Sequence, residues 1–371
     1  MDERTKYFVG LDVHKESISI AVAEAGRAAG RLLGQIPHDT SKLLRKLGAI
    51  GEASEVHVVY EAGPTGYGLQ RDLVRHGYAC EVIAPSLIPK RGGDRVKTDQ
   101  RDSLRLAELS RAGELTAIWI PDTVDESIRD LARAREDAIN ARRQVRHQLR
   151  GFLLRHSIRY SGKTAWTKTF YRWLGTLSFP ERSSQMAFTE YLLAIEAGDK
   201  RVERLSVALE EAIAGWRFEP VVKALCALRG IDMVSAIGLV AEIGDIGRFD
   251  HPRKLMGYLG LVPSEHSSGD KVNRGSITKC GNSHARRLLT EASWNYRFKA
   301  RIGYRAQRRQ EELSTTIRDI AWKAQLRLTT RFAKLTARGV NANKVCIAVA
   351  RELAGFVWAI ARSATALNVP G

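Results

Sequence analysis

Short segments of the first 120 residues carry hydrophobic side chains at alternate positions, a pattern typical of half-buried strands. Five segments predict strands, the third more weakly than the rest: 7–13 (YFVGLDV), 17–23 (SISIAVA), 31–36 (RLLGQI), 55–60 (EVHVVY) and 80–85 (CEVIAP). Segments 39–48 and 66–77 predict helices that end at Gly48 and Gly77. This order of elements predicts an α/β domain with a mixed sheet.

After about residue 123 the hydrophobic residues recur at spacings of three and four, which predicts helices. Residues 126–156 and 187–216 show two long amphipathic patterns that fit a coiled coil or a helical hairpin. The connector between them, residues 161–184, is both aromatic and basic. We therefore expect a central helical segment with an aromatic and basic insert.

From about residue 219 onward the pattern is again mostly helical. Residues 225–245 predict two helices broken at Gly230, 261–283 predict a Gly- and Ser-rich loop, and 285–362 predict a series of basic helices. The whole chain thus predicts an α/β plus α architecture. We expect three parts: an α/β domain at 1–122, the helical coiled-coil segment at 123–217 and a helical C-terminal domain at 218–371.

The charge of the chain indicates its class of partner. Its 371 residues include 59 Lys and Arg against 41 Asp and Glu, a net charge of +18, which favours nucleic acid before a membrane surface. The N-terminus lacks the apolar region of a secretory signal, and the apolar pattern at 345–361 is interrupted by Arg351 and Glu352. The four cysteines stand singly, which argues against a zinc site or a disulfide framework. We therefore expect a cytoplasmic protein with no membrane partner.

Four carboxylates occupy positions of the α/β domain where functional groups are common. Asp12 interrupts an apolar strand, and Glu61 follows another strand at its C-terminal end. Asp99 and Asp102 are three residues apart and so share one face of a helix. Taken singly, Asp99 would suit a helix N-terminus and Asp102 could pair with a nearby Arg. As an ordered set, the four acids predict oxygen ligands for Mg²⁺ and a two-ion site for phosphoryl transfer.

Several motifs of the chain resemble one family. GLDVHK, YEAGPTG and KTDQRDS, in this order and spacing, resemble the N-terminal ribonuclease-H/RuvC-like domain of the DEDD-type insertion-sequence transposases. RGIDMVSAIGLVAEIGDIGRF, GYLGLVPSEHSSGDK and ITKCGNSHARRLLTEAS resemble the second domain of these transposases. The segment GKTAWTKTFYRWL is similar to the subgroup with a longer central insert. The resemblance covers residues 6–160 and 220–310, which is most of the chain.

The resemblance implies a ribonuclease-H fold and a recombinase that cleaves and exchanges DNA strands with the four acids as catalytic metal ligands. It also implies guidance by a structured RNA encoded by the mobile element, and a serine nucleophile in the second domain. The serine of the family precedes a glycine, which selects Ser268, and the adjacent Ser267 leaves the register open. Read by local sequence alone, Ser-Ser-Gly is a turn.

Residues after about 123 indicate which partners the chain binds. Eight Arg lie between residues 129 and 155, with few acids to offset them, which favours contact with a nucleic-acid backbone over a solvated face. The aromatic residues of the connector could stack on unpaired bases or form a small core. Exchange between two DNA ends requires at least two active sites, so we expect a homo-oligomer, a dimer or tetramer. The apolar seam at 188–213 offers an interface for it.

Three other classes of protein fit the sequence less well. A RuvC-like, metal-dependent junction nuclease would use the same acids but would hydrolyse DNA without Ser268. A sugar-kinase or actin-like ATPase would need a second phosphate loop of the D-x-G-G type, which the sequence lacks. A non-catalytic DNA-binding module would explain the charge but not the four ordered acids.

Overall fold

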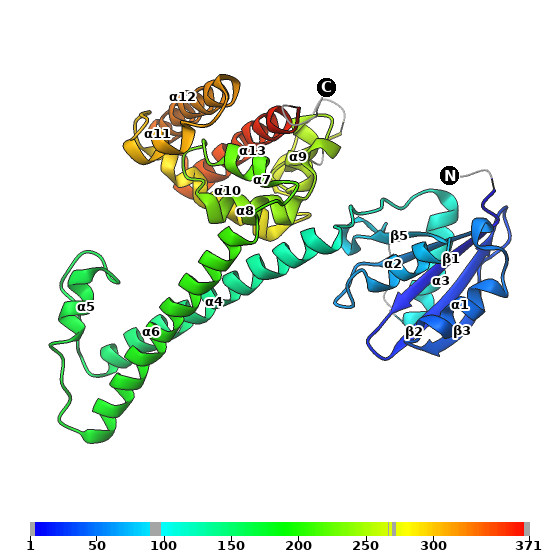
Figure 1. Ribbon diagram of the computed structural model, residues 1–371, viewed down its shortest axis with the longest axis horizontal. Coiled ribbons are helices and arrows are strands. Elements are labelled where there is room, and N and C mark those ends of the chain that lie inside the picture. The colour runs from blue at the N-terminus through cyan, green and yellow to red at the C-terminus, as the bar shows by residue number, and fades with distance from the viewer. Residues whose placement is uncertain (1–3, 90–97, 266, 269–271, 367–371) are drawn as a thin grey trace. The chain divides into compact units, whose positions relative to one another are not determined.

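A computed structural model describes residues 4–89, 98–265, 267–268 and 272–366 of the chain (Figure 1). The chain divides into two compact units, residues 1–120 and 121–371. The long central helices belong to the second unit. The further boundary that we expect near residue 217 stays a prediction.

The first unit is built on one five-stranded sheet. Its strands are β1 (Tyr7–Val13), β2 (Ser17–Glu24), β3 (Arg31–Pro37), β4 (Val56–Glu61) and β5 (Ala79–Ile83). They lie in the order β3-β2-β1-β4-β5. β1, β2 and β3 are antiparallel neighbours, whereas β1, β4 and β5 run parallel. The mixed sheet predicted from alternating hydrophobic residues is therefore confirmed.

Helices cover both faces of this sheet, because its strands carry hydrophobic side chains on both sides. The helices are α1 (Thr40–Gly48), α2 (Gly68–Arg75) and α3 (Asp99–Ala112), with 3₁₀ turns at Ala53–Glu55 and Pro85–Leu87. α1 and α2 pack with Val9 and Leu11 of β1 on one face. α3 packs with Phe8 and Ala21 on the other. The unit thus has a three-layer arrangement with α3 alone on the second face among its described helices.

Two long helices open the second unit. α4 (Thr123–Arg155) and α6 (Arg182–Glu211) lie side by side as a hairpin (Figure 1). α5 (Lys168–Leu174) belongs to the connector that joins them at one end. The seam residues of α6 that are buried recur every seven positions: Phe188, Ile195, Val202 and Leu209. They pack within one chain, which confirms a helical hairpin. The expectation that this seam forms the interface of an oligomer is therefore wrong for these buried residues.

The rest of the second unit is a helical body. Its helices are α7 (Glu219–Leu225), α8 (Met233–Ile243), α9 (Pro252–Tyr258), α10 (Ser283–Ser293), α11 (Tyr304–Gln310), α12 (Thr315–Ala337) and α13 (Ala342–Ala366), with 3₁₀ turns at Ile246–Arg248 and Trp294–Arg297. α13 lies at its centre and contacts α7, α9, α10 and α12. No helix within the described ranges is long and apolar enough to cross a membrane.

One detail of the helical body differs from the sequence prediction. The composition of residues 261–283 predicts a loop, but the segment includes the antiparallel strands β6 (Pro263–Glu265) and β7 (Arg274–Ile277). These strands are three and four residues long and largely exposed, so they carry no alternation of buried and exposed side chains that a sequence pattern could reveal.

Candidate metal centre

Helix α3 packs directly on the backbone of β1, and Gly10 makes this possible. A Cβ atom at residue 10 would lie 2.1 Å from the carbonyl oxygen of Ser103 and 2.5 Å from the amide nitrogen of Ala107. Only glycine leaves room for so close an approach. Since side chains alternate along a strand, Asp12 points to the same face of the sheet as Gly10, which is the face that α3 covers.

Local sequence explains why α3 begins beside Asp12. Thr98 caps the helix, because its side-chain oxygen accepts a hydrogen bond from the amide of Arg101 at 3.4 Å. Asp99 and Asp102 then occupy the first turn, where the positive end of the helix dipole favours acidic side chains. Gly113, in the left-handed conformation with φ 70°, ends the helix.

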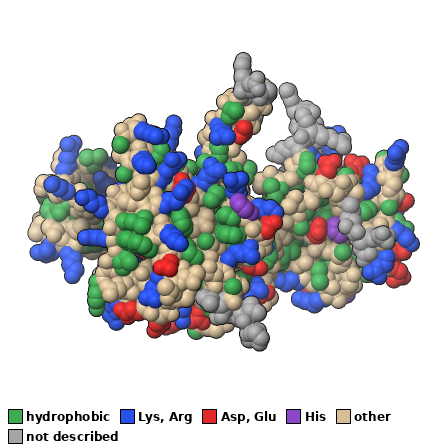
Figure 2. Space-filling model, turned by 90° about the horizontal axis from the view of Figure 1, so that it is seen from above, with side chains coloured by type: hydrophobic (Ala, Val, Ile, Leu, Met, Phe, Trp, Pro, Cys, Tyr) green, Lys and Arg blue, Asp and Glu red, His purple; other side chains and the backbone are tan. Residues whose placement is uncertain are grey.

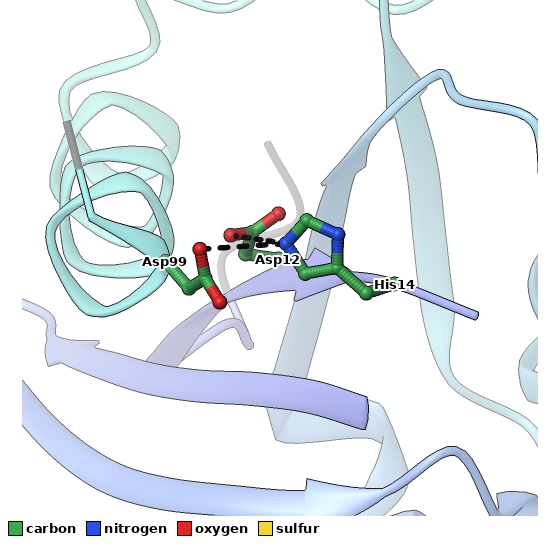
Figure 3. A group of neighbouring side chains, drawn as sticks. All are labelled: Asp12, His14 and Asp99. Carbon is green, nitrogen blue, oxygen red and sulfur yellow. Dashed lines mark hydrogen bonds and ion pairs between the residues drawn. The ribbon is translucent and has the colours of Figure 1, made fainter. Parts of the chain in front are cut away.

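The side chains of Asp12, His14 and Asp99 meet at this end of the sheet (Figure 3). His14 Nε2 lies 3.2 Å from Asp12 Oδ2 and 3.5 Å from Asp99 Oδ1. One ligand atom of each residue falls within 4.8 Å of the other two. Asp12 is half-buried, whereas His14 and Asp99 are exposed, so the group opens to solvent on one side.

The surroundings of Asp12 oppose its negative charge. Burial raises the pKa of its carboxyl group most strongly, and the nearby charges of Asp99 and Asp102 raise it further. The imidazole of His14 offsets only part of this effect. A divalent cation would neutralise the crowded carboxylates and remove the mismatch, and carboxylate oxygens are the donors that hard divalent ions such as Mg²⁺ accept.

The other two predicted acids lie next to this group. β1 and β4 are paired so that Leu11 faces Tyr60, and Asp12 and Glu61 are therefore the next residues of two parallel neighbours. Glu61 and Asp102 are both half-buried. Asp102 is close enough for its charge to act on Asp12. Among the described residues, Asp12, His14 and Asp99 are the three whose ligand atoms lie within 4.8 Å of one another. Glu61 and Asp102 lie beside these three residues.

His14 is a member that the sequence analysis missed. The motif GLDVHK places it two residues after Asp12, which in an extended chain is the same side. The main chain at His14 is anchored as well, because its carbonyl oxygen lies 2.6 Å from His38 Nδ1. The two-residue spacing from Asp12 was a signal that could have identified it.

Ser268 lies in the second unit, between β6 and β7, and its side chain is exposed. The adjacent Ser267 is engaged: its hydroxyl donates to Glu265 Oε1 at 2.8 Å and accepts from the amide of Asn273 at 3.2 Å. Ser268 has no hydrogen bond to the described residues. His266 and residues 269–271, which include the glycine used to choose the register, lie outside the described residues.

Known proteins match the chain over nearly its whole length. A family of transposases of the DEDD type, named after IS110, matches residues 9–158, and "Transposase IS116/IS110/IS902 family" matches residues 222–309. "Putative transposase y4qE" of Sinorhizobium fredii is 48% identical over 359 residues, covering 96% of this chain and 89% of that protein. "Transposase for insertion sequence element IS1533" of Leptospira borgpetersenii is 31% identical over 342 residues, covering 90% of this chain and 97% of that protein.

The strand order 3-2-1-4-5, with acids at the end of the first strand and at the start of α3, defines a protein with a ribonuclease-H/RuvC-like catalytic fold. The helical second unit and the relatives narrow this class to one family. The chain belongs to the IS116/IS110/IS902 family of insertion-sequence transposases.

Proposed function

We propose that this transposase cleaves and exchanges DNA strands by metal-dependent phosphoryl transfer, with Asp12, Glu61, Asp99 and Asp102 as ligands of Mg²⁺. One observation carries the proposal: Asp12 and Asp99, from a strand and a helix far apart in sequence, approach the same imidazole within 3.5 Å. The raised pKa of Asp12 adds support, since functional sites are where charges are left uncompensated.

The residues of the chain have separate tasks in this proposal. A bound Mg²⁺ would supply Lewis-acid stabilisation of charge on a phosphate oxygen. Asp12 and Asp99 hold oxygen ligands in place on two rigid elements. The imidazole of His14 lies between the carboxylates of Asp12 and Asp99 and fixes the distance between them. Glu61, at the end of the neighbouring strand, extends the acidic edge on which a second ion would be held.

Ser268 is the proposed nucleophile. Its oxygen attacks the phosphorus of a DNA phosphodiester and gives up its proton, the bond from phosphorus to one deoxyribose oxygen breaks, and that oxygen takes up a proton. The serine–phosphate ester conserves the energy of the bond, so the hydroxyl of a new strand can displace the serine without ATP. The engagement of Ser267 in two hydrogen bonds supports Ser268 as the residue that is available to react.

The partners follow from the same proposal. DNA at the element ends and at the target is the substrate, and a structured RNA encoded by the element guides the reaction. The reaction requires a homo-oligomer, a dimer or tetramer, because two ends must be processed together. The excess of Lys and Arg, which are spread over much of the face drawn in Figure 2, supports a polyanionic partner. The proposed place of action is the cytoplasm, where the DNA lies.

A strand-exchange assay with single substitutions tests the metal ligands. Asp12→Asn and Asp102→Asn should each abolish cleavage and exchange, since the neutral amide is a poor ligand for Mg²⁺. Asp72→Asn makes the same chemical change on α2, where Asp72 pairs with Arg75 at 2.9 Å, and should leave activity intact. Near-normal exchange by Asp12→Asn would refute the proposed site.

A suicide DNA substrate tests the serine. Trapping the reaction on it should give a protein–DNA adduct in a denaturing gel. Ser268→Ala should abolish this adduct and Ser267→Ala should spare it. An adduct that depends on Ser267 would shift the nucleophile by one residue. Cleavage without any adduct would instead identify the chain as a metal-dependent nuclease that uses water.

A further inference from the structure

Six of the eight arginines of α4 fall into two sets with different environments. In the first half of the helix, Arg133 pairs with Glu242 of α8 at 2.7 Å and Arg135 donates to Ser206 of α6 at 2.7 Å, so the first side chain joins the hairpin to the helical body and the second joins its two arms. In the second half, Arg142, Arg143, Arg146 and Arg150 line a cavity of about 360 Å³ together with His147 and Trp166. Within the second set the fold explains Arg142 and Arg146, which pair with Asp199 of α6, but not Arg143 and Arg150.

Trp166 forms the wall of this cavity. The guanidinium group of Arg146 lies over its ring, 4.8 Å from the ring centre, and the ring of Phe170 packs beside it at 4.9 Å. Trp166 has φ 65°, in the left-handed region that residues other than glycine seldom adopt. The aromatic connector thus folds into a small core against the hairpin, as one of the two interpretations of the sequence expected, and encloses the arginines from one side.

The charges of the cavity are poorly balanced. Asp199 is its one anionic partner among the described residues, and it accepts hydrogen bonds from Arg142 at 2.8 Å and from Arg146 at 3.0 Å. Arg143 contacts only a neutral amide, the side chain of Asn140 at 3.0 Å. Arg150 has no ion pair within the described part of the chain. Two arginines are therefore held in place by an acid, and two present charge that the protein does not neutralise.

A second cavity continues the first. Its volume is about 770 Å³, it shares His147 and Arg150 with the smaller one, and it adds Arg159 and Lys163 to the basic lining. Tyr160 and Trp173 supply aromatic walls there. Cavities of roughly 300–1,000 Å³ enclose whole small molecules rather than single atoms. The concavity is thus large enough to take a nucleotide that has left a base stack.

We propose that this basic cavity, between the second half of α4 and the connector at residues 159–173, binds the phosphate backbone of an unpaired nucleic-acid strand. Guanidinium groups match phosphate geometry; Arg142 and Arg146 are half-buried and held in place by Asp199, whereas Arg143 and Arg150 are exposed and open to a ligand. Arg142 and Arg150 are eight residues apart, a rise of about 12 Å, which spans more than one phosphate. An open hollow lined by guanidinium groups and an aromatic ring fits a flexible single strand better than the convex ridges of a duplex.

The inference rests on the proposed function only in that the chain acts on nucleic acid. The phosphodiester backbone can come from RNA or from displaced DNA, and the experiment distinguishes the two. Binding is measured without divalent cations, so that no cleavage can occur and the result does not depend on the carboxylate site. Loss of binding and loss of strand exchange are then separate observations.

The test compares two double variants of the full chain by fluorescence anisotropy. Arg143→Gln/Arg150→Gln removes the two unneutralised charges and leaves Asp199 and its partners intact. Arg201→Gln/Arg204→Gln removes two exposed charges from α6 and is the matched control. The probes are short labelled oligonucleotides of one sequence as single-stranded RNA, single-stranded DNA and duplex DNA. Thermal melting checks that both variants remain folded.

We expect the cavity variant to bind a single strand about tenfold more weakly for each phosphate group that it no longer holds. The dependence of log K on log salt should also fall, by about 0.7 for each of these phosphates on a single strand. A greater decrease for RNA identifies RNA as the source, and a greater decrease for single-stranded DNA identifies DNA. An equal decrease on the duplex, an equal decrease in the control variant, or unchanged binding by a folded cavity variant would overturn the proposal.

Discussion

Asp12 in the first unit is a half-buried carboxylate and Glu242 in the second unit is a buried one, and their surroundings differ. The side chain of Glu242 is 2% exposed, and it accepts hydrogen bonds from Arg133 at 2.7 and 3.0 Å and from Asn282 at 2.6 Å. Burial would raise the pKa of Glu242, but the contacts with His284, Arg133 and Asn282 outweigh it and hold the pKa well below its ordinary value of 4.5.

Asp12 shows the opposite balance. Burial raises its pKa above the ordinary value of 3.8, His14 lowers it only in part, and Asp99 and Asp102 raise it again. The fold has therefore satisfied the charge of Glu242 and left that of Asp12 unsatisfied. A buried acid with full partners ties elements together, whereas an acid placed among other acids is arranged for something that binds. Four predictions test this contrast.

The largest effect on stability is expected where α3 meets β1. Gly10→Ala would place a methyl group 2.1 Å from the carbonyl oxygen of Ser103, so the helix that carries Asp99 must move away. We expect a loss of about 3 kcal/mol or more in the free energy of unfolding, the upper range for an overpacked core. Urea unfolding measures it. Gly48→Ala, where a Cβ would meet nothing within 4 Å, is the control and should not destabilise.

The next effect separates the two acids directly. Glu242→Gln removes the negative charge that pairs with Arg133, and we expect it to cost about 1–3 kcal/mol of stability, because Arg133 itself remains half exposed. Asp12→Asn removes a charge that its surroundings oppose and should leave stability unchanged or raise it. Equal destabilisation by both substitutions in thermal melts would show that Asp12 is a structural acid like Glu242.

A third, smaller effect concerns Mg²⁺. At a concentration ten times its dissociation constant, an ion that binds only the folded protein stabilises it by about 1.4 kcal/mol. We therefore expect Mg²⁺ to raise the melting temperature of the natural chain and of Glu242→Gln when the latter is folded. Asp12→Asn should show no such rise. A rise of the same size in Asp12→Asn would place the bound ion elsewhere.

The smallest effect is a difference in pH dependence, measured without divalent cations. Glu242 has a lowered pKa, so its stabilising contribution is present above pH 4.5 and is lost as the pH falls toward its folded pKa. Asp12 has a raised pKa, so its unfavourable contribution is present at neutral pH and is relieved as the pH falls through that pKa toward 3.8. Relative to Asp12→Asn the natural chain should gain stability on acidification; relative to Glu242→Gln it should lose it.

Much of the fold of the first unit could be predicted from the sequence, because each of its strands and helices is indicated by residues that are neighbours in the chain. Alternating residues indicated the five strands, and Thr98 followed by Asp99 and Asp102 marked the start of a helix. The site itself needed more. The two-residue spacing places His14 on the side of Asp12, but no sequence pattern shows that its imidazole also approaches Asp99. The close approach of α3 depends on the contact of residue 10 with Ser103, which lies 93 residues later in the chain.

The contacts of the second unit could be predicted less well, because they join residues that are far apart in the chain. Glu242 and Arg133 are 109 residues apart, and no pattern around either residue indicates the other. The sequence of the Arg-rich helix indicates one continuous basic face, but its two halves differ because only the first half lies against the acids of the helical body. The sequence shows how many arginines the helix carries, but which of them are paired with acids depends on the fold.

The seven-residue recurrence along α6 limits how the hairpin can change length in evolution. Phe188, Ile195, Val202 and Leu209 keep facing α4 only if insertions or deletions preserve that period in both helices. Each permitted step of seven residues changes the length of the hairpin by about 10.5 Å. Hairpins of related proteins should therefore differ in discrete increments, and each increment would move the basic cavity along the hairpin by the same distance.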